Sequence, residues 1–397
     1  QLSRQRGKVA SVGLCGAKKN IGKVLFMGKM QKILFSLSFV LALVLSGCGV
    51  ESENTAAAED AEDHRVFNWK MVTAWPPNLP INQDTVHKFS RDVELMSRGR
   101  LRIKVYAGGE LVPALQTFDA VSQGAVEMGH GASYYWAGKV PAAQFLSTVP
   151  FGMMQNGAWA WIYSGEGLGL WRELYEPFGI VPFPLGNTGI QMGGWFNKEI
   201  NTIEDLKGLK MRIPGLGGKV LAKAGGNPVL LSAAEIYTAL ERGTIDATEW
   251  VGPLHDLRFG LDRAAKYYYY PGWHEPGTQL ELIINSNAWA DLPADLKTIV
   301  EAAAASASLY MYGLSEVGNM DAFNSLKNKD HIQVLEFPKE VTLHLAKLTR
   351  EVLREEAEKD EKFMKVLNSY TEFRARRASF NKATEQSYQS ILRELNN

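Results

Sequence analysis

The spacing of apolar positions changes repeatedly along the chain from Val66 onward. Residues 67–74, 101–106 and 126–129 are short apolar runs typical of strands, and residues 82–96 place apolar side chains three or four positions apart. The second spacing is the period of an amphipathic helix, whereas the short runs suit buried strands. This order of strand, helix and strand predicts an α/β protein with a parallel-rich sheet and helices on both of its faces.

Element boundaries are marked most clearly in the middle of the chain. Thr202 and Ser232 are each followed three positions later by an acidic residue, Asp205 and Glu235. This capping-box arrangement satisfies free N–H groups at a helix start. The elements expected here are a short helix before Gly208, helices at 113–123, 218–224 and 233–242, and strands at 210–213, 228–231 and 245–249.

The last third of the chain becomes long, charged and helical. Pro293 is well placed to open a helix that we expect to reach Leu314, because proline is tolerated in the first helical turn. Few turn signals interrupt residues 342–395. Just before this region, Tyr267–Tyr270 predicts a strand whose rings alternate between core and surface.

The N-terminal segment has the features of an export signal. Lys29 and Lys32 precede residues 33–45, an apolar run whose only polar members are two serines. Such a run is too short to cross a hydrocarbon layer of about 30 Å and has the length of a signal-peptide core. The following Leu-Ser-Gly-Cys sequence resembles the lipobox of bacterial lipoproteins, which implies that Cys48 is lipidated.

Translation is expected to begin at Met27 or Met30, because residues 1–26 have neither signal-peptide hydrophobicity nor a helical period. We interpret residues 1–26 as upstream read-through. The mature chain then keeps no cysteine for a disulfide, since Cys15 precedes the start and Cys48 carries lipid.

The net charge of the N-terminal segment differs from that of the rest of the chain. The 43 basic and 43 acidic residues cancel overall, but residues 1–47 hold eight basic residues and no acidic one, so the remainder has a net charge of −8. A chain of 397 residues, 46% of them hydrophobic, excludes a disordered or collagen-like protein. The acidic remainder argues against a broad nucleic-acid-binding surface. Residues 48–65 are small and acidic, which predicts a flexible tether.

Candidate binding residues lie in segments where polar or aromatic side chains interrupt apolar runs. Arg212 follows a strand at a Pro-Gly turn, where a guanidinium can hold a carboxylate through two parallel hydrogen bonds or form a surface ion pair. Glu249 and Glu275 each end an apolar run beside Trp or His, which favours burial in a cleft. The segments are 133–136 (SYYW), 191–195 (QMGGW), 246–253 (DATEWVGP) and 267–277 (YYYYPGWHEPG).

These segments, together with the MRIPG sequence at 211–215, closely resemble the solute-binding proteins of TRAP transporters, in particular the branch that binds α-keto acids and related 2-hydroxy acids. The similarity covers residues 66–390, and the pairing of EWVGP with YYYYPGWHEPG is its most specific part. The resemblance implies a two-lobed periplasmic-binding-protein fold with a ligand cleft between α/β lobes and a long C-terminal helical extension.

The resemblance also implies roles for particular residues. Arg212 would anchor the ligand carboxylate, and a cation would bind the Glu249 carboxylate, the Trp250 carbonyl oxygen and the Gln191 amide oxygen. Glu275 would accept a hydrogen bond from a ligand hydroxyl or complete the metal site. Two carboxylates and an anionic ligand against one arginine require such a cation. Oxygen ligands favour Na⁺ or Ca²⁺.

Aromatic residues are expected to line the rest of the cleft. The cluster of Tyr134, Tyr135 and Trp136 would form the opposite wall, with a phenol as one donor to the ligand; Tyr135 is our candidate, and Tyr134 and Trp136 are alternatives. Trp195, Trp250 and Trp273 are all well explained as core side chains, and of the three Trp250 is the candidate to close over the ligand. The residues around His274 do not form an H-E-x-x-H zinc helix.

The predicted organisation follows from these assignments. A leader occupies residues 1–47 and a lipidated tether 48–65. The first lobe lies mainly in residues 66–187, the second mainly in 188–277, and residues 278–341 cross between the lobes and complete both. The C-terminal helices fill 342–397, and the resemblance implies their exchange between two subunits of a homodimer.

The resulting prediction is an exported, membrane-anchored binding subunit that delivers a small organic acid to the membrane subunits of a TRAP transporter. A binding protein for a dicarboxylate or larger acid, or for another type of transporter, is the main alternative. A secreted hydrolase that uses Glu249 and Glu275 is more distant, because the sequence has no G-x-S-x-G, Walker or G-x-G-x-x-G motif. We therefore predict no enzymatic activity and no organic cofactor.

Overall fold

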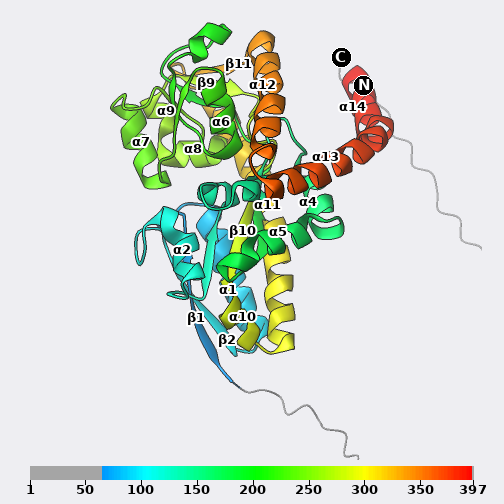
Figure 1. The fold of residues 1–397 in the computed structure, drawn as a ribbon. Coiled ribbons are helices and arrows are strands. Elements are labelled where there is room, and N and C mark those ends of the chain that lie inside the picture. Colours follow the sequence, from blue (N-terminus) through cyan, green and yellow to red (C-terminus); the bar gives the residue numbers. More distant parts are fainter. Residues whose placement is uncertain (1–64, 396–397) are drawn as a thin grey trace, which may run out of the picture. The chain divides into compact units, whose positions relative to one another are not determined.

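The computed structural model describes residues 65–395, so the predicted leader, Cys48 and nearly all of the tether lie outside the described residues (Figure 1). Their strands form two sheets, and we call each sheet with its covering helices a lobe. The sheet of the first lobe has the order β2-β1-β3-β10-β4, made of Leu101–Tyr106, Phe67–Thr73, Met128–Gly131, Gln279–Asn285 and Ile180–Asn187.

The sheet of the second lobe has six strands in the order β11-β9-β5-β8-β6-β7. They are Gln333–Glu336, Tyr267–Tyr270, Gly194–Phe196, Ala247–Thr248, Lys210–Arg212 and Asn227–Val229. Strand β10 runs antiparallel to β3 and β4, and β5 runs antiparallel to β8 and β9, while the other pairs are parallel. Both sheets are therefore mixed, which corrects the prediction of a parallel-rich sheet.

The helices that follow strands of the two sheets are short, except for α1. Around the first sheet they are α1 (Asn82–Met96), η1 (Ala114–Gln116), α2 (Thr117–Ser122), η2 (Ser133–Trp136), η3 (Pro141–Ala143), α3 (Gln144–Ser147), α4 (Gln155–Ser164), α5 (Gly167–Tyr175), η4 (Glu176–Phe178) and α10 (Ser286–Asp291). Around the second they are η5 (Ile203–Leu206), α6 (Gly215–Lys223), α7 (Ala233–Glu241), α8 (Pro253–Phe259) and α9 (Leu261–Ala264).

Long helices form the C-terminal part of the chain. They are α11 (Ala294–Lys327), α12 (Lys339–Ala357), α13 (Glu361–Asn381), a π-helical turn η6 (Lys382–Gln386) and α14 (Ser387–Leu395). None of the helices within residues 65–395 combines the length and the apolar character that crossing a bilayer requires.

Helix α11 belongs to both lobes. Its N-terminal part packs on β4 and α1, where Ala303 and Ala307 let it approach Val86 and Phe89 of α1 in one buried core. Its C-terminal part packs on α8. Burying each large side chain stabilises the fold by about 1.5–3 kcal/mol. Because α11 buries side chains in both lobes, it holds the two lobes together.

The predicted end of this helix at Leu314 is wrong, since α11 continues to Lys327. Tertiary packing explains the continuation, because Ala322 and Leu326 beyond the predicted end are buried. A Cβ on Gly318 would lie 2.5 Å from the Leu254 side chain of α8. The residue is therefore small because another helix crosses there, and it does not end the helix.

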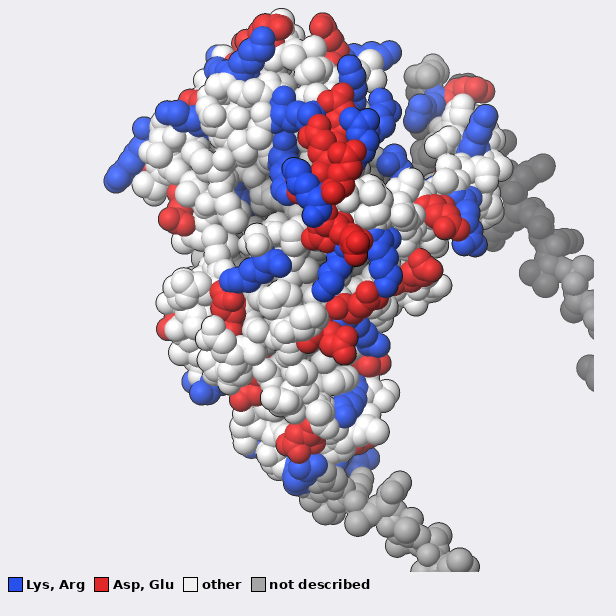
Figure 2. Space-filling model, in the orientation of Figure 1, with Lys and Arg blue, Asp and Glu red and all other residues white. Residues whose placement is uncertain are grey.

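The C-terminal chain crosses back from the second lobe to the first. Helix α12 packs on α6, where Lys219 and Lys223 form ion pairs with Glu356 and Glu355. Figure 2 shows a band of interspersed acidic and basic residues on one face of the molecule. Helix α13 then packs against α3, α4 and α5, and its Tyr370 hydroxyl accepts a hydrogen bond of 2.7 Å from the Met153 amide.

Helix α14 leaves the body of the lobes (Figure 1). Its apolar residues are exposed, with Tyr388 at 61% and Leu395 at 75%. Phe380 at the end of α13 is exposed as well. The α/β class and the long C-terminal helical extension predicted from the sequence are both confirmed.

Two local predictions have opposite outcomes. Both capping boxes, Thr202 with Asp205 and Ser232 with Glu235, are confirmed. The alternation of rings in Tyr267–Tyr270 is wrong, because Tyr268 and Tyr269 are both buried. Strand β9 lies inside the sheet with packed layers on both faces, so neighbouring rings stack on Trp195 and on Phe337.

Candidate functional site

The direction of the second-lobe strands brings the candidate residues to one edge of that sheet. β6 and β8 are parallel with Arg212 opposite Thr248, so Arg212 and Glu249 leave the sheet side by side. Strand β5 is antiparallel to both β8 and β9, so its N-terminal end, which Gln191 precedes, lies at the edge where β9 ends. Ligands of α/β proteins bind beyond the carboxyl ends of such strands.

Two glycines allow these loops to approach each other closely. Gly194 has a φ of +113°, and a Cβ there would lie 2.5 Å from the Thr248 carbonyl oxygen. A Cβ on Gly272 would lie 2.2 Å from the Gln191 carbonyl oxygen. Any side chain at either position would push apart the loops that carry Gln191, Glu249 and Glu275.

Arg212 is 1% exposed and forms an ion pair with Oε1 of Glu249. Its Nε donates to the Leu231 carbonyl and its second terminal nitrogen to the Tyr135 hydroxyl, each at 3.4 Å. The guanidinium also lies 5.3 Å from the centre of the Trp250 ring. Burial alone would lower the pKa of Arg212, but the Glu249 carboxylate raises it above its ordinary value.

Glu249, His274 and Glu275 form a buried cluster, in which one potential ligand atom of each residue lies within 4.8 Å of the others. His274 Nε2 is 3.5 Å from Oε2 of Glu249. Burial and the nearby Glu249 carboxylate raise the pKa of Glu275 well above its ordinary value. This shift favours the neutral form of Glu275 and so reduces the negative charge in the cluster.

Gln191 is held by two threonines. Its Nε2 donates to the hydroxyls of Thr188 at 3.2 Å and Thr278 at 3.1 Å. The Thr278 hydroxyl in turn donates to Oε2 of Glu275. Because both contacts use the amide nitrogen, the orientation of the Gln191 amide is fixed with its oxygen directed elsewhere.

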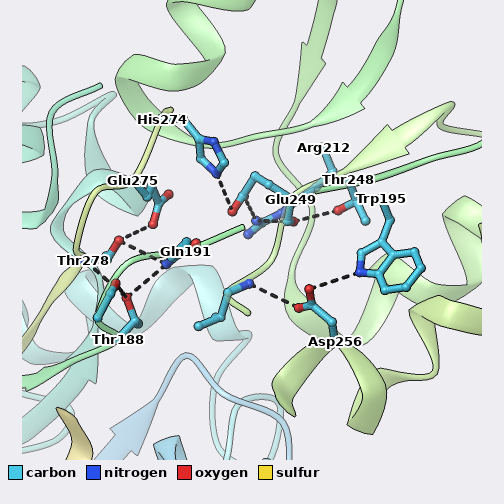
Figure 3. A network of polar contacts seen from close by, with 12 residues as sticks. Thr188, Gln191, Trp195, Arg212, Thr248, Glu249, Asp256, His274, Glu275 and Thr278 are labelled. Carbon is cyan, nitrogen blue, oxygen red and sulfur yellow. Dashed lines mark hydrogen bonds and ion pairs between the residues drawn. The ribbon is translucent and has the colours of Figure 1, made fainter. Parts of the chain in front are cut away.

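Several buried polar atoms of this cluster have no hydrogen-bond partner among the described residues. They are Oε1 of Gln191, Oε2 of Glu249, Nε1 of Trp250 and both ring nitrogens of His274. Figure 3 shows Gln191, Glu249, His274 and Glu275 converging on one region. Since each unsatisfied buried polar group costs about 1–3 kcal/mol, such a concentration needs an explanation, and a bound polar ligand or ion provides one.

The first lobe contributes the 133–136 segment. Tyr135 contacts Arg212, as described above, and burial raises the pKa of its hydroxyl. Trp136 points away from Arg212, because its Nε1 donates to Oε1 of Glu281 at 2.5 Å inside the first lobe. The structure thus brings Tyr135 to the candidate site and excludes the Trp136 indole nitrogen from it.

The other tryptophans divide in the same way. Trp250 lies between the Arg212 guanidinium and Phe259, on which it stacks at 4.9 Å. Trp195 donates to Asp256 and Trp273 stacks on Phe151, so both serve packing.

The lobes are closed over the cluster. Gln191, Arg212, Glu249, Trp250 and Glu275 are each between 0% and 4% exposed. A groove of about 300 Å³ lies between the two lobes. One side is lined by Ala74, Pro76, residues 108–109 and residues 113–115, and the other by Ser232–Glu235. A small molecule could reach the buried cluster only if the lobes separate.

Four residues of this network were not identified from the sequence. His274 was set aside because it lacks the zinc-helix spacing, and Thr188, Thr278 and Asp256 were not considered. The bonds of Thr278 to Gln191 and of Asp256 to Trp195 join segments distant in sequence, whereas Thr188 lies three positions before Gln191. No local pattern of residues signals such bonds. Only His274, adjacent to Glu275, had a sequence signal that could have been used.

Comparison with known proteins gives consistent results. The profile of the family "Bacterial extracellular solute-binding protein, family 7" (DctP) matches residues 71–360. The chain is 44% identical over 325 residues to the monocarboxylate 2-oxoacid-binding periplasmic protein of Nostoc sp. PCC 7120, which covers 81% of this chain and 88% of that protein.

Two solved structures of similar fold contain ligands. A TRAP periplasmic solute-binding protein from Pseudoalteromonas atlantica with bound sodium and pyruvate is 44% identical, with a TM-score of 0.80, covering 82% of this chain and 99% of that one. A TRAP solute-binding protein from Bordetella bronchiseptica is 36% identical, with a TM-score of 0.81, covering 83% and 98%. The latter is a dimer of mixed occupancy with calcium and picolinate in one active site.

Proposed function

The chain belongs to the bacterial extracellular solute-binding proteins of family 7, and we propose on that premise that it captures a small 2-oxo or 2-hydroxy monocarboxylate together with Na⁺ or Ca²⁺. The loaded protein delivers the acid to the membrane subunits of a TRAP transporter. It is a binding protein and not an enzyme.

We call the buried cluster of Gln191, Arg212, Glu249, Trp250 and Glu275 the chamber. The observation that carries this proposal is a pair of buried oxygens in it that accept no hydrogen bond from the described residues, Oε1 of Gln191 and Oε2 of Glu249, the latter 3.5 Å from His274 Nε2. A chamber that holds one arginine and one ionised glutamate becomes negative when an anionic acid enters. A cation bound to the two oxygens restores the balance of charge. Carboxylate and amide oxygens are ligands that Na⁺ and Ca²⁺ accept.

The residues that would hold the cation are Gln191, Glu249 and Trp250, the last through its backbone carbonyl, with Glu275 beside them. When bound, the cation would attract the ligand oxygens and neutralise their charge. The His274 nitrogens next to Glu249 were not part of the predicted oxygen set. We assign His274 to hydrogen bonding with the ligand or with Glu249, since hard cations favour oxygen over imidazole.

Arg212 would hold the ligand carboxylate, with Tyr135 as a second donor and Trp250 as an apolar wall. Arg212 is the only buried Lys or Arg among residues 65–395. A second carboxylate on the ligand would therefore have no basic partner in the chamber. This favours a monocarboxylate over the dicarboxylate alternative.

In pyruvate and picolinate, the ligands of the two solved relatives, the carbon next to the carboxylate bears a donor atom, the keto oxygen in pyruvate and the ring nitrogen in picolinate. The carboxylate and this donor can chelate one cation together. We therefore propose chelation by a carboxylate oxygen and the donor atom on the adjacent carbon as the feature that the site selects.

Isothermal titration calorimetry tests the proposal. Pyruvate and lactate should bind in NaCl or CaCl₂ and lose most of their affinity when the cation is replaced by N-methylglucamine at equal ionic strength. Succinate serves as the dicarboxylate control. Equal binding with and without cation, or turnover of any ligand, would contradict the proposal.

The attachment to a membrane is a separate proposal, because Cys48 lies outside the described residues. The lipobox-like sequence and the periplasmic location of the relative support lipidation at Cys48. Expression of the full chain and of Cys48→Ser in a bacterial host would test it. Recovery of the unsubstituted chain in the soluble fraction, without an acyl mass on Cys48, would contradict it.

We also propose that α13 and α14 of two subunits form a homodimer. The exposed Phe380, Tyr388, Ile391 and Leu395 support it, because an apolar helix face requires cover. Light scattering should give twice the chain mass, and a monomeric mass would rule the dimer out.

The assignment of the lobes to 66–187 and 188–277, with 278–341 completing both, remains a prediction.

A further inference from the structure

Asp256 is a buried carboxylate in α8 that the proposed function does not use. It is 1% exposed. Its Oδ2 accepts hydrogen bonds from the Tyr268 hydroxyl at 2.7 Å and from Nε1 of Trp195 at 3.1 Å. Its Oδ1 faces the backbone N–H of Val251 at 3.4 Å. Figure 3 shows Asp256 and Trp195 on the opposite side of Glu249 from Gln191 and Glu275.

The N–H of Val251 belongs to the same peptide unit as the carbonyl of Trp250. A peptide bond is planar and trans, so its N–H and C=O point in opposite directions. An N–H that is directed at Asp256 therefore directs the Trp250 carbonyl away from Asp256. That carbonyl is the backbone oxygen assigned to the cation under the proposed function.

The peptide units on either side are fixed by other bonds. The Glu249 carbonyl accepts from the Thr248 hydroxyl at 2.8 Å, and the Val251 carbonyl accepts from the Met192 amide at 3.2 Å. Among residues 65–395, no hydrogen-bond donor reaches the Trp250 carbonyl oxygen. Of three successive carbonyls, only that of Trp250 keeps its oxygen available for an ion.

We propose that Asp256 is a positioning residue for the cation, which acts by holding the Trp250–Val251 peptide so that the Trp250 carbonyl faces the chamber. An acceptor on the N–H also polarises the peptide and makes its carbonyl oxygen a better ligand. Groups that orient metal ligands in this way change metal affinity by roughly 10–100-fold when they are replaced. The inference rests on the proposed function, because it needs the cation.

Asp256→Asn is the most direct variant. Two donors, Tyr268 and Trp195, face one carboxylate oxygen, so the asparagine oxygen will turn toward them. Its NH₂ group then faces the Val251 N–H, and two donors cannot bond. The peptide is released although the side chain keeps its size.

The measurement is pyruvate affinity of the full chain by calorimetry as a function of NaCl or CaCl₂, with N-methylglucamine chloride keeping the ionic strength constant. We expect Asp256→Asn to lower the apparent affinity for both cations by about tenfold or more. The pyruvate Kd at saturating cation should stay within about threefold of the unsubstituted protein. Unchanged cation affinity would overturn the inference.

Two comparisons separate positioning from other causes. Tyr268→Phe removes one donor to Asp256 and leaves the Val251 contact, so it should lower thermal stability without changing cation affinity. An equal loss of cation affinity in this variant would mean that Asp256 only maintains the fold. If the fold-loss of affinity in Asp256→Asn is squared for Ca²⁺ relative to Na⁺, Asp256 acts on the cation through its negative charge alone. That result would also overturn the positioning role.

The unsubstituted protein provides a test if Asp256→Asn does not fold. The Val251 amide should be protected from hydrogen exchange before any cation is added, and exchange at the rate of a free peptide would overturn the inference. Failure of the proposed function has a different signature, namely pyruvate binding to the unsubstituted protein that is insensitive to both cations.

Discussion

Glu281 and Glu249 are equally buried, at 0% exposure, but their surroundings differ. Both oxygens of Glu281 are occupied inside the first lobe, Oε1 by Trp136 and Oε2 by the hydroxyls of Ser133 and Tyr175 at 2.9 Å each. Glu249 uses Oε1 for Arg212 and leaves Oε2 without a hydrogen bond. A closed network stabilises the fold, whereas an incomplete one indicates where a ligand binds.

The comparison predicts its largest effect for Arg212→Ala. Removing the guanidinium deletes the anchor of the ligand and leaves Glu249 buried without its ion-pair partner, so pyruvate affinity should fall about 10³-fold, or roughly 4 kcal/mol. Calorimetry in saturating NaCl measures this. Arg258→Ala, an exposed site on α8, is the matched control and should bind as the unsubstituted chain does. Wild-type affinity in Arg212→Ala would remove the anchor role.

Glu281→Leu should have the next largest effect, but on stability. The change leaves the hydroxyls of Ser133 and Tyr175 without their acceptor and leaves Nε1 of Trp136 only the Tyr175 hydroxyl at 3.2 Å, so the free energy of unfolding should fall by about 3 kcal/mol. Chemical denaturation measures the loss. Pyruvate affinity at saturating cation should change less than about threefold, and a loss as large as that of Arg212→Ala would show that both glutamates serve binding.

Glu249→Gln should act on the cation. It keeps the size of the side chain and removes the charge, so the apparent Na⁺ affinity should fall about 100-fold. The readout is the dependence of the pyruvate Kd on NaCl. If the NaCl dependence is unchanged, Glu249 is not a cation ligand. The distinction between a structural Glu281 and a ligand-binding Glu249 would then be wrong.

The smallest predicted effect concerns pH. Burial raises the pKa of Glu281 from 4.5 to about 7. The folded state then binds more protons than the unfolded state between these values, so stability falls as pH rises through this window, by about 2.5 kcal/mol between pH 5 and pH 8. Glu281→Gln should lack this contribution when denaturation is compared at pH 5 and pH 8. A parallel pH dependence in both proteins would contradict the assignment.

Other buried groups also make stability depend on pH, so the unsubstituted protein must be compared with Glu281→Gln. Asp256, with a pKa raised by burial to about 7, changes stability in the same direction as Glu281. His130 and His255, whose pKa values burial lowers to about 4, act in the opposite direction and reduce stability as pH falls below about 6.5. Only the difference between the unsubstituted protein and Glu281→Gln isolates one group.

The sequence predicted the elements around the site better than the contacts within it. Capping boxes and apolar periods placed β6, α7 and β8, and with them Arg212 and Glu249. These signals are local, since each depends on residues a few positions apart. The extent of α11 was missed because its C-terminal part is held by tertiary contacts, such as that of Gly318 with Leu254 of α8.

The roles of two buried carboxylates, Glu281 of β10 and Asp256 of α8, illustrate the same limit. Glu281 stands in an apolar strand and gave no signal in the sequence, although it binds three side chains. Its partners lie about 100 to 150 positions away along the chain. Asp256 is similar, because the Trp195 and Tyr268 that bond it belong to β5 and β9.

The position of α11 limits how this protein can be recombined with its relatives. One helix of 34 residues supplies buried side chains to both lobes. A chimera that exchanges only the second lobe would pair a foreign α8 with the native surface around Gly318, where an added methyl group would lie 2.5 Å from the Leu254 side chain and force it to shift. A chimera designed to transfer ligand preference should therefore take α8 and α11 from the same protein, so that the contact between these two helices is preserved.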